Sequence, residues 1–410
     1  MTEPVFEPTR DGFMNDPFPD YARLRAHGPV HHHGESGIFF VLDYDLAQHV
    51  MKDPETFSSV VDRARMREGG LPKRVEEIKA QGYQLAPTLS HNDTPSHADF
   101  RSVVQPLFMP AALRAQQEGI QKRIETLWSA IPMDEEIDFV SAFSVPLPIG
   151  VIGDYLGLSH YGDDQLKEWS DAFADEIGFQ TSDDRAIRVA ELMLECHQAM
   201  DATIQARRDD PREDIISHLA LASLPDGRRM EIGELLSILT QLLVAGNETT
   251  TNSLSAGILR LSEHPELAAR LRETPKLMSR FVEELLRLEA PVQGQFRIAT
   301  RDVDLGGTTV PKGSRVHIRF AAANRDPDIY GGTADTVILD TVRKKQHMSF
   351  GAGMHFCVGA LLSRMELRLA FNHILANTSA IEAHAALHEL PFAPSFHLRG
   401  MLSLPVTFRA

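Results

Sequence analysis

The 410-residue sequence is poor in cysteine, with only Cys196 and Cys357, and neither belongs to a CxxC pair. A disulfide framework, a four-cysteine zinc site and an iron–sulfur cluster held by four thiolates are therefore excluded. Basic residues are also few, because 41 Lys and Arg stand against 57 Asp and Glu, which gives a net charge of -16. We therefore expect no nucleic-acid binding of the kind that neutralises phosphates.

The sequence also lacks a long uninterrupted apolar run. The most apolar window, FSVPLPIGVIGDYLGL, is cut by proline and charge, and the opening MTEPVFEPTRDGF has neither the basic nor the apolar part of an export signal. We expect no membrane-spanning or exported segment, and a reducing cytoplasm fits the cysteine content best. Because no linker, repeat or low-complexity tract is present, residues 1–410 are predicted to form one domain.

Helical periodicity dominates from about residue 107 to residue 290. Residues 231–264 are apolar on nearly every face in their first half, which predicts a helix of about 34 residues, roughly 50 Å long, through the middle of the protein. A shorter helix is predicted over 275–290, stopped by the proline that follows. Strand signals predict hairpins over 29–44 and 302–320. The expected fold class is mainly α with small β-sheets (α+β).

Cys357 lies in the glycine-rich stretch FGAGMHFCVGA, just before an apolar stretch with helical spacing. A cysteine ahead of a helix N-terminus has free backbone N–H groups and the positive end of the helix dipole nearby, and both stabilise a thiolate. Gly351, Gly353 and Gly359 let the backbone approach a flat ligand closely. The arrangement suits an anionic sulfur ligand, and the alternative for the cysteine alone is a buried, inert thiol in a tight turn.

The long helix contains LLVAGNETTTN, in which polar residues interrupt an apolar run. Buried acids and hydroxyls in mid-helix are costly unless they are paired or used. A threonine hydroxyl that bonds back to a carbonyl one turn earlier would, with Gly246, open a local groove for a small ligand and water, and Glu248 would supply protons to it. The alternative is a threonine-rich kink that faces solvent.

Two further pairs of residues are weak signals when taken alone. Glu284 and Arg287 are three residues apart in EELLR, where an ion pair forms readily, but a solvated surface pair is the simpler explanation. His97 and Arg101 follow DTPS and are four apart, so two donors on one helix face suit an anion such as a carboxylate. Each has a satisfied structural role as its plainer interpretation. Two more donors of this kind stand later in the chain, Arg297 and His355.

Together these stretches resemble one family, the cytochrome P-450 haem-thiolate monooxygenases of the soluble bacterial type. FGAGMHFCVGA matches the pattern FGxGxHxCxG, AGNETT matches (A/G)Gx(D/E)TT and ELLR matches ExxR, in the order of the family. DTPSHADFR early in the chain and ANRDPDIY ahead of the cysteine stretch extend the resemblance over essentially the whole sequence. The resemblance implies the fold of that family, with haem b (iron protoporphyrin IX) buried beside the long central helix.

The resemblance also implies roles for the matching residues. Cys357 would be the proximal thiolate ligand of the haem iron. Thr249 would hold the bound dioxygen and its water, and Glu248 would relay protons to it. The haem propionates would be bound by His97, Arg101, Arg297 and His355. The other implied haem contacts are Phe350, Gly351, Gly359 and Ala245. The implied structural residues, which would join a helix to the ANRDP segment, are Glu284, Arg287 and Arg325.

The pocket walls of the family correspond here to residues that are apolar apart from a few amides. These are Leu85, Phe179, Gln241, Val244, Ala245, Val292, Gln293, Gln295 and Phe396. Such a lining suits a small to medium hydrophobic molecule with one or two polar groups, and terpenoid, steroid-like and aromatic substrates all stay open. The family implies hydroxylation with O2 and two electrons from a separate ferredoxin-type donor. A candidate contact for the donor is the basic run Arg343, Lys344 and Lys345, although such a run is more often a solvated face.

The sequence departs from the family pattern in two places. The stretch GGTADTVILDTVRKKQHMSFG lacks the usual RF pair, and the acid before Thr249 is glutamate where aspartate is commoner. Cys196 matches no role and is expected to pack within a helix, while the run of histidines at 31–33 is expected to be a surface feature. A haem-thiolate sensor or electron carrier, and an enzyme that uses peroxide or isomerises its substrate, are the rival functions. The intact acid–threonine pair argues against both.

Overall fold

The structure is a computed structural model that describes residues 7, 10, 12–61, 70–178 and 182–410. It divides into two compact units. The strand-bearing unit comprises residues 1–59, 121–144 and 249–410, and the helical unit comprises residues 60–120 and 145–248. The chain passes between the units more than once, so neither unit is a continuous stretch. That residues 1–410 act as one domain stays a prediction.

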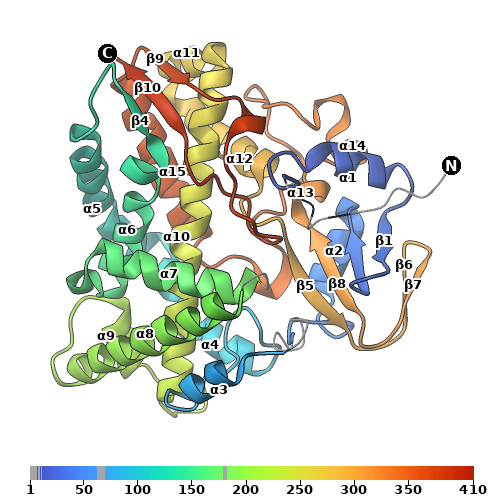
Figure 1. Cartoon of the computed structure of the whole chain (residues 1–410), viewed down its shortest axis with the longest axis vertical. Coiled ribbons are helices and arrows are strands. Elements are labelled where there is room, and N and C mark those ends of the chain that lie inside the picture. Colours follow the sequence, from blue (N-terminus) through green and yellow to red (C-terminus); the bar gives the residue numbers. More distant parts are fainter. Residues whose placement is uncertain (1–6, 8–9, 11, 62–69, 179–181) are drawn as a thin grey trace. The chain divides into compact units, whose positions relative to one another are not determined.

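All strands of the described residues belong to the strand-bearing unit. Their bounds are β1 Val30–His33, β2 Ile38–Val41, β3 Phe57–Ser58, β4 Glu136–Asp138, β5 Gly294–Ala299, β6 Val303–Leu305, β7 Thr308–Val310, β8 Arg315–Arg319, β9 Ala380–Ala383 and β10 Pro405–Arg409. The largest sheet has the order β1-β2-β8-β5-β3, and a second sheet has the order β4-β10-β9 (Figure 1). In the large sheet only the β2–β8 pair is parallel.

The first predicted hairpin is confirmed, because β1 and β2 pair antiparallel with Val30 opposite Val41. The second prediction is correct for its first half only. β6 and β7 form a hairpin across Gly306 and Gly307, whereas β8 does not pair with β7 and joins the large sheet beside β5 and β2. Gly306 and Gly307 have φ values of 62° and 84°, a left-handed conformation that glycine adopts without strain.

Among the described residues, seven α-helices lie wholly within the strand-bearing unit. These are α1 Phe18–Arg25, α2 Tyr44–Lys52, α11 Pro265–Glu273, α12 Met278–Glu289, α13 Phe320–Ala323, α14 Pro327–Tyr330 and α15 Ala360–Ala376. A buried cluster joins the large sheet to α2, because Val41, Val50, Phe57, Val316 and Ile318 are all at the core. Each fully buried side chain of this size contributes about 1.5–3 kcal/mol to folding, so this cluster fixes α2 against the sheet.

The helical unit contains no strand among its described residues. Its helices are α3 Lys73–Lys79, α4 Ser96–Val104, α6 Pro146–Leu156, α7 Asp163–Gly178, α8 Asp183–Asp209 and α9 Ile215–Leu221. α7 and α8 pack along each other (Figure 1), and a small core of Val75, Ile78, Ala186 and Ala190 joins α3 to α8. Cys196 is buried in α8, in agreement with the expectation that it packs within a helix.

Two helices have residues in both units, α5 Pro110–Ser129 and α10 Ile232–Glu263. α10 is the predicted long helix, with 32 residues where about 34 were expected. Most of its side chains are buried, as the apolar character of its first half predicts, and its course through the middle of the protein stays a prediction. Figure 1 shows it as a single long helix. The predicted shorter helix is α12, preceded by a single 3₁₀ turn over Pro275–Leu277. Among the described residues, no helix has the length and apolar character needed to cross a membrane.

Candidate active site

Cys357 lies in a tightly turned loop that ends where α15 begins. The Cys357 N–H donates to the Phe350 carbonyl at 2.9 Å, which closes the loop, and Gly359 is the N-cap of α15. Gly353 has a φ of 67°, and a Cβ at that position would lie 2.5 Å from the Met51 carbonyl oxygen, so only glycine fits there. The thiol is half-buried, and the nearby start of the helix favours its thiolate form.

The cysteine loop is held by α12 and by the segment that follows β8. The Ser349 hydroxyl donates to the Leu286 carbonyl at 2.6 Å. The Asn324 amide donates to Ser349 Oγ at 2.8 Å and accepts from the Met348 N–H at 2.6 Å. Because Asn324 makes both bonds from a fully buried position, it fixes the path of the chain into the loop.

Phe350, at the start of the loop, lies beneath a guanidinium group. The Arg364 guanidinium carbon is 4.4 Å from the centre of the Phe350 ring, and Arg364 makes two hydrogen bonds to Glu283 of α12, at 2.6 and 2.9 Å. Burial opposes ionisation of Glu283, but the hydrogen bonds from Arg364 and His347 lower its pKa to about 2. The pair therefore stays charged at neutral pH and fixes the ring beside Cys357.

Arg297 of β5 and the cysteine loop share one neighbour, Met51 of α2. Arg297 is 4% exposed, and its Nη2 is 3.4 Å from the Met51 sulfur. A Cβ on Gly351 would lie 3.3 Å from the Met51 methyl carbon. His355, inside the loop, has its Nε2 at 2.8 Å from the Ser59 hydroxyl. The strand-bearing unit thus brings Cys357, Arg297 and His355 to one region.

One face of α10 is less buried than the rest of the helix. Gln241, Glu248 and Thr249 are half-buried and Ala245 is exposed, and their spacing of three to four residues puts them on one side. The groove expected beside Gly246 stays a prediction. A Cβ there would lie 2.9 Å from the Ile152 side chain of α6, so the glycine admits close packing while α10 stays helical throughout.

Hydroxyl groups fix the second half of α10. The Ser253 hydroxyl donates to the Thr249 carbonyl one turn earlier at 2.8 Å, a back-bond of the kind expected for the threonines. The Thr251 hydroxyl donates to the Ser144 carbonyl at 3.0 Å. The Thr250 hydroxyl lies 3.3 Å from Ser363 Oγ, which connects α10 to α15 a little beyond Cys357. The threonine run therefore does not face solvent as a kink.

Glu248 belongs to a charged cluster in the helical unit. Its Oε1 is 3.4 Å from Lys167 Nζ of α7 and accepts from the Asn247 amide at 2.9 Å, and Lys167 also pairs with Asp171. Burial raises the pKa of Glu248, and the Lys167 charge opposes that rise only in part. Burial therefore favours the neutral form of Glu248, and the Asn247 amide, which also donates to Ser170 at 3.0 Å, orients its carboxyl group.

Glu284 and Arg287 form a buried ion pair rather than a solvated one. Arg287 is 1% exposed and donates to both Glu284 oxygens at 3.0 Å, and Arg343 donates to the same oxygens at 3.1 and 2.9 Å. The remaining Arg287 donors reach the carbonyls of Asn324, Ala334 and Thr336. Burial opposes ionisation of Glu284, but the hydrogen bonds from Arg287 and Arg343 lower its pKa.

The expectation for Arg325 and Arg343 needs correction. Arg325 donates to the Leu288 carbonyl of α12 at 2.9 Å, so it joins the ANRDP segment to that helix, but the second cation on Glu284 is Arg343. Arg343 was expected to face a redox partner; its guanidinium instead turns inward to Glu284 and Thr333. Lys344 and Lys345 are exposed, and Lys345 lies 3.5 Å from Asp45.

His97 and Arg101 lie on α4 of the helical unit, as the sequence predicts. His97 is 2% exposed, and Arg101 is half-buried with its Nε donating to Gln105 at 3.0 Å. Their spacing of four residues leaves them on one face of the helix.

The residues expected to line a pocket differ in their burial and in whether their amides already bond within the protein. Gln293 is fully buried and accepts from the Tyr21 hydroxyl at 3.0 Å while it donates to the Ala290 carbonyl at 2.7 Å, so its amide is used within the protein. The Gln241 amide is likewise engaged, with Thr88 and Ser90. Phe179 lies outside the described residues. The other members are Leu85, which is exposed, Val244, which is buried, and Val292, Gln295 and Phe396, which are half-buried.

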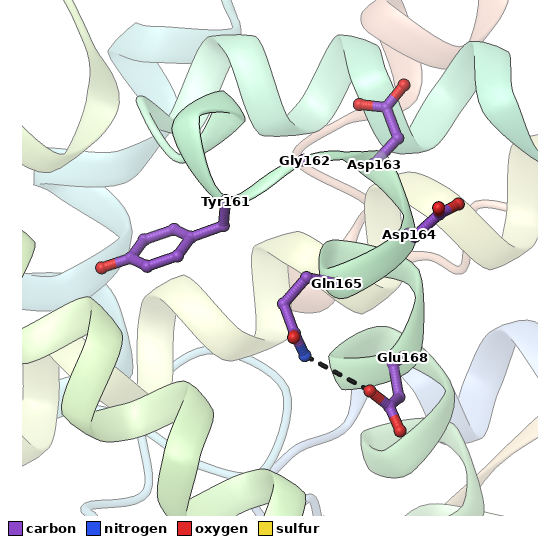
Figure 2. Close-up of a pocket in the computed structure, with 6 residues that line it drawn as sticks. All are labelled: Tyr161, Gly162, Asp163, Asp164, Gln165 and Glu168. Atoms are coloured by element: carbon purple, nitrogen blue, oxygen red, sulfur yellow. Dashed lines mark hydrogen bonds between the residues drawn. The ribbon is translucent and has the colours of Figure 1, made fainter.

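A separate hollow of about 500 Å³ lies at the start of α7 in the helical unit (Figure 2). Figure 2 shows its acidic lining, with the Gln165 amide directed at Glu168 at 3.4 Å. Across the described ranges, no group of three or more His, Cys, Asp or Glu side chains is arranged to hold a metal ion. Because Glu168 is also paired with Arg188 at 2.9 Å, the hollow offers no reactive group comparable with Cys357 or Glu248.

Several of these contacts were not predicted from the sequence. Met51, Ser59 and Arg364 support the cysteine loop and its histidine, and Lys167 partly offsets the rise in the pKa of Glu248. Only Arg364 carried a signal, since it lies on the helix that follows the cysteine. Lys167 is 81 residues from its partner, so no local pattern could reveal it.

The family model for cytochrome P450 matches residues 167–384 of the chain. The chain is 33% identical over 409 residues to cytochrome P450 monooxygenase PikC of Streptomyces venezuelae, a match that covers 97% of this chain and 92% of that protein. It is 34% identical over 374 residues to linalool 8-monooxygenase of Pseudomonas putida, covering 88% of this chain and 89% of that one.

Solved structures give the same result. The cytochrome P450 CREJ, solved in complex with (4-ethylphenyl) dihydrogen phosphate, aligns with a TM-score of 0.90 and 27% identity over 97% of this chain and 98% of that chain. The expected mainly α fold with small sheets is thereby confirmed down to the fold family.

Proposed function

This chain belongs to the cytochrome P450 family and is a monooxygenase of that family, and we propose that it hydroxylates a small to medium hydrophobic organic molecule with O2 and two electrons from a separate ferredoxin-type donor. The observation that carries the proposal is the half-buried Cys357 thiol in its fixed loop at the start of α15. In the same chain, α10 carries a carboxyl group whose pKa is raised by burial, directly before Thr249.

The family implies haem iron, and the residues present fit such a group. Cys357 offers one thiolate that would bind the iron, and Gly359 leaves its sulfur uncrowded, since even a Cβ there would stay 4.0 Å from it. Arg297 and His355 supply cationic or neutral N–H donors of the kind that bind carboxylates. We propose haem b, with Cys357 as the ligand and with contacts from Phe350, Gly351, Gly359 and Ala245. The proposed propionate ligands are His97, Arg101, Arg297 and His355.

Haem supplies the oxygen chemistry when it is bound, and the protein supplies binding, orientation and protons. Glu248 is suited to passing a proton, because burial raises its pKa while Lys167 keeps the charged form accessible. We propose that Glu248 passes this proton to the Thr249 hydroxyl. Thr249 lies on the same face of α10 as Ala245. Asn247 fixes the carboxyl group of Glu248, so the path does not depend on a large side-chain movement.

The proposed substrate class follows from the apolar lining expected around Leu85, Val244 and Val292. A relative named for its action on linalool supports a hydrophobic substrate. For the electron donor we propose contacts at Lys344 and Lys345, because Arg343 is turned inward. A cytoplasmic location stays a prediction.

The test is the absorption spectrum of the reduced, carbon-monoxide-bound protein. The wild type should give the red-shifted Soret band typical of thiolate ligation, and Cys357→Ala should abolish that band. Cys196→Ala is the matched control, because Cys196 is the other cysteine and is buried in α8. The assignment fails if the wild type lacks the band or if Cys357→Ala keeps it.

A second arm separates an oxygenase from a haem sensor or electron carrier. With reduced nicotinamide, a ferredoxin and its reductase, a hydrophobic compound that shifts the haem iron from low to high spin should be hydroxylated. Consumption of reductant without any oxygenated product from compounds that cause this shift would count against the oxygenase assignment.

A further inference from the structure

Residues 84–91 of the helical unit, which we call the 84–91 segment, lie along the first half of α10 and contact it at three successive turns. A Cβ on Gly233 would lie 2.0 Å from the Gln84 carbonyl oxygen, so the segment begins in direct contact with the α10 backbone. One turn later, the Ser237 hydroxyl accepts from the Ala86 N–H at 3.2 Å.

Gln241, one turn further along, makes the largest set of bonds. Its Nε2 donates to Thr88 Oγ1 at 2.8 Å and to the Ser237 carbonyl at 2.9 Å. Its Oε1 accepts from the Ser90 N–H at 3.0 Å and from the Ser90 hydroxyl at 2.8 Å. An amide has two donor hydrogens and two strong acceptor sites, so these four bonds use the whole group.

The spacing of the three α10 positions explains why a segment can follow the helix. Gly233, Ser237 and Gln241 are four residues apart, which puts them in one row along the helix surface. The same row continues to Ala245 and Thr249, on the face that carries the proposed oxygen chemistry. The hydrogen bonds from the 84–91 segment to this row of α10 therefore end at Gln241, one turn before Ala245.

Both ends of the segment are anchored within the helical unit. The Tyr83 hydroxyl, just before it, donates to Asp201 of α8 at 2.8 Å. Just after it, Asn92 and Ser96 bond to each other at the start of α4, the helix of His97. Between the anchors, the Leu85 side chain is 44% exposed, so the bonds of its neighbours to α10 also fix where this apolar side chain stands.

We propose that Gln241 is a positioning residue that controls which molecules reach the haem by holding the 84–91 segment, and Leu85 with it, against α10. This inference rests on the proposed function, because it needs a substrate that reaches the face of α10 beyond Gln241. It replaces the expectation that Gln241 touches the substrate, since an amide with all four positions used inside the protein has none left for a ligand. The position of the 84–91 segment, rather than a contact with the Gln241 amide, then determines which molecules reach the haem.

The first measurement is hydrogen exchange of peptides that cover residues 84–91 in the haem-loaded protein. Gln241→Met keeps the side-chain length and removes all four bonds, so exchange at Ser90 should rise on the order of 10-fold, as expected for the loss of one or two hydrogen bonds. Gln241→Glu should stay near the wild type, because its carboxylate still accepts from Ser90 and the Thr88 hydroxyl can donate to it. Ser237→Ala should affect Ala86 and leave Ser90 protected.

The second measurement is the binding rate of two nitrogen ligands of haem iron that differ in size, imidazole and 4-phenylimidazole. Gln241→Met should change the ratio of their association rate constants by about three-fold or more, because the bulkier probe is sensitive to the segment and the smaller one is not. Gln241→Glu should restore the wild-type ratio. Ser255→Ala is the matched control, since its hydroxyl bonds to Ser144 and Thr251 from the other half of α10.

The proposal is overturned if Gln241→Met leaves Ser90 exchange unchanged, if exchange rises while the ratio stays that of the wild type, or if Ser255→Ala gives the same change. Failure of the proposed function is a different result. A protein without the thiolate Soret band would end the oxygenase assignment, whereas the exchange measurement would still report whether Gln241 holds the segment.

Discussion

Two glutamates, the buried Glu284 on α12 and the half-buried Glu248 on α10, have opposite pKa shifts. Glu284 receives two hydrogen bonds from each of two guanidinium groups and one from the Ile338 N–H. Glu248 has one ammonium at 3.4 Å and one amide at 2.9 Å. Burial works against ionisation at both, yet the pKa is lowered at Glu284 and raised at Glu248.

The difference shows that partners, rather than burial, decide what a buried acid does. Bidentate guanidinium groups hold a carboxylate in one geometry and keep it charged, so Glu284 can only be structural. A single lysine shared with a second acid, Asp171, leaves the charge of Glu248 adjustable. The first arrangement stabilises the fold beneath the cysteine loop, and the second suits proton transfer.

The largest expected effect comes from removing a cation at Glu284. Arg287→Leu leaves a buried carboxylate with one cation fewer and three backbone carbonyls without their donor, so the free energy of unfolding should fall by about 3–5 kcal/mol. Lys167→Leu is the matched change at Glu248 and should cost about 1 kcal/mol or less, because Glu248 can take up a proton and Lys167 is partly exposed. Urea unfolding of the haem-loaded proteins measures both, and equal losses would remove the distinction.

An intermediate effect is expected on turnover from Glu248→Gln. The carboxamide keeps the shape but cannot carry a proton, so the rate of product formation should fall by about 10²-fold or more, while stability changes little. Product formation should therefore be slow, while the binding of a compound that shifts the haem iron from low to high spin should stay unchanged.

The control for that change is another acid on the same helix, Glu234, which is bonded to Arg228 at 2.8 Å and lies at the start of α10. Glu234→Gln should keep the wild-type rate. If Glu248→Gln also kept it, the proton would have to reach Thr249 by a route that does not include Glu248.

Much of the fold could be predicted because the signals were local. The apolar run of α10 and the prolines at its end and after α12 defined those helices, and a glycine pair defined the β6–β7 turn. β5 was missed because GQFRIA has no clear alternation, and it is a strand only because β8 and β3 pair with its two edges. Such pairing depends on contacts distant in sequence.

The same limit applies to the candidate site. The positions of Cys357 and Thr249 were readable from short motifs, but their supports were not. Arg343 stood in a basic run that looks like a solvated face, and its inward turn depends on Glu284, 59 residues away. Gln241 was read as a pocket amide, because nothing in its own stretch indicates that residues 88 and 90 use both ends of the group.

The smallest expected effect is in the pH dependence of stability. A raised pKa in the folded state means that Glu248 binds its proton more tightly when folded, so its favourable contribution is present below the pKa of the unfolded chain, near 4.5, and is lost as pH rises through the folded pKa. In Lys167→Leu the negative charge of the nearby Asp171 remains and the cation that opposes it is absent. The loss of stability with rising pH should therefore be larger than in the wild type.

Lys167→Leu should therefore be less stable than Lys167→Leu with Glu248→Gln at pH 7, by about 1 kcal/mol, and the gap should narrow as the pH is lowered towards 5. For the wild type compared with Glu284→Gln, the difference in the free energy of unfolding should depend on pH in the opposite sense. There the lowered pKa makes the wild type the more stable protein above about pH 4.5, and its advantage is lost only as pH falls through the folded pKa. Unfolding curves across this range measure both differences in the free energy of unfolding. If both differences changed with pH in the same direction, the two acids would be held alike, in conflict with their different partners.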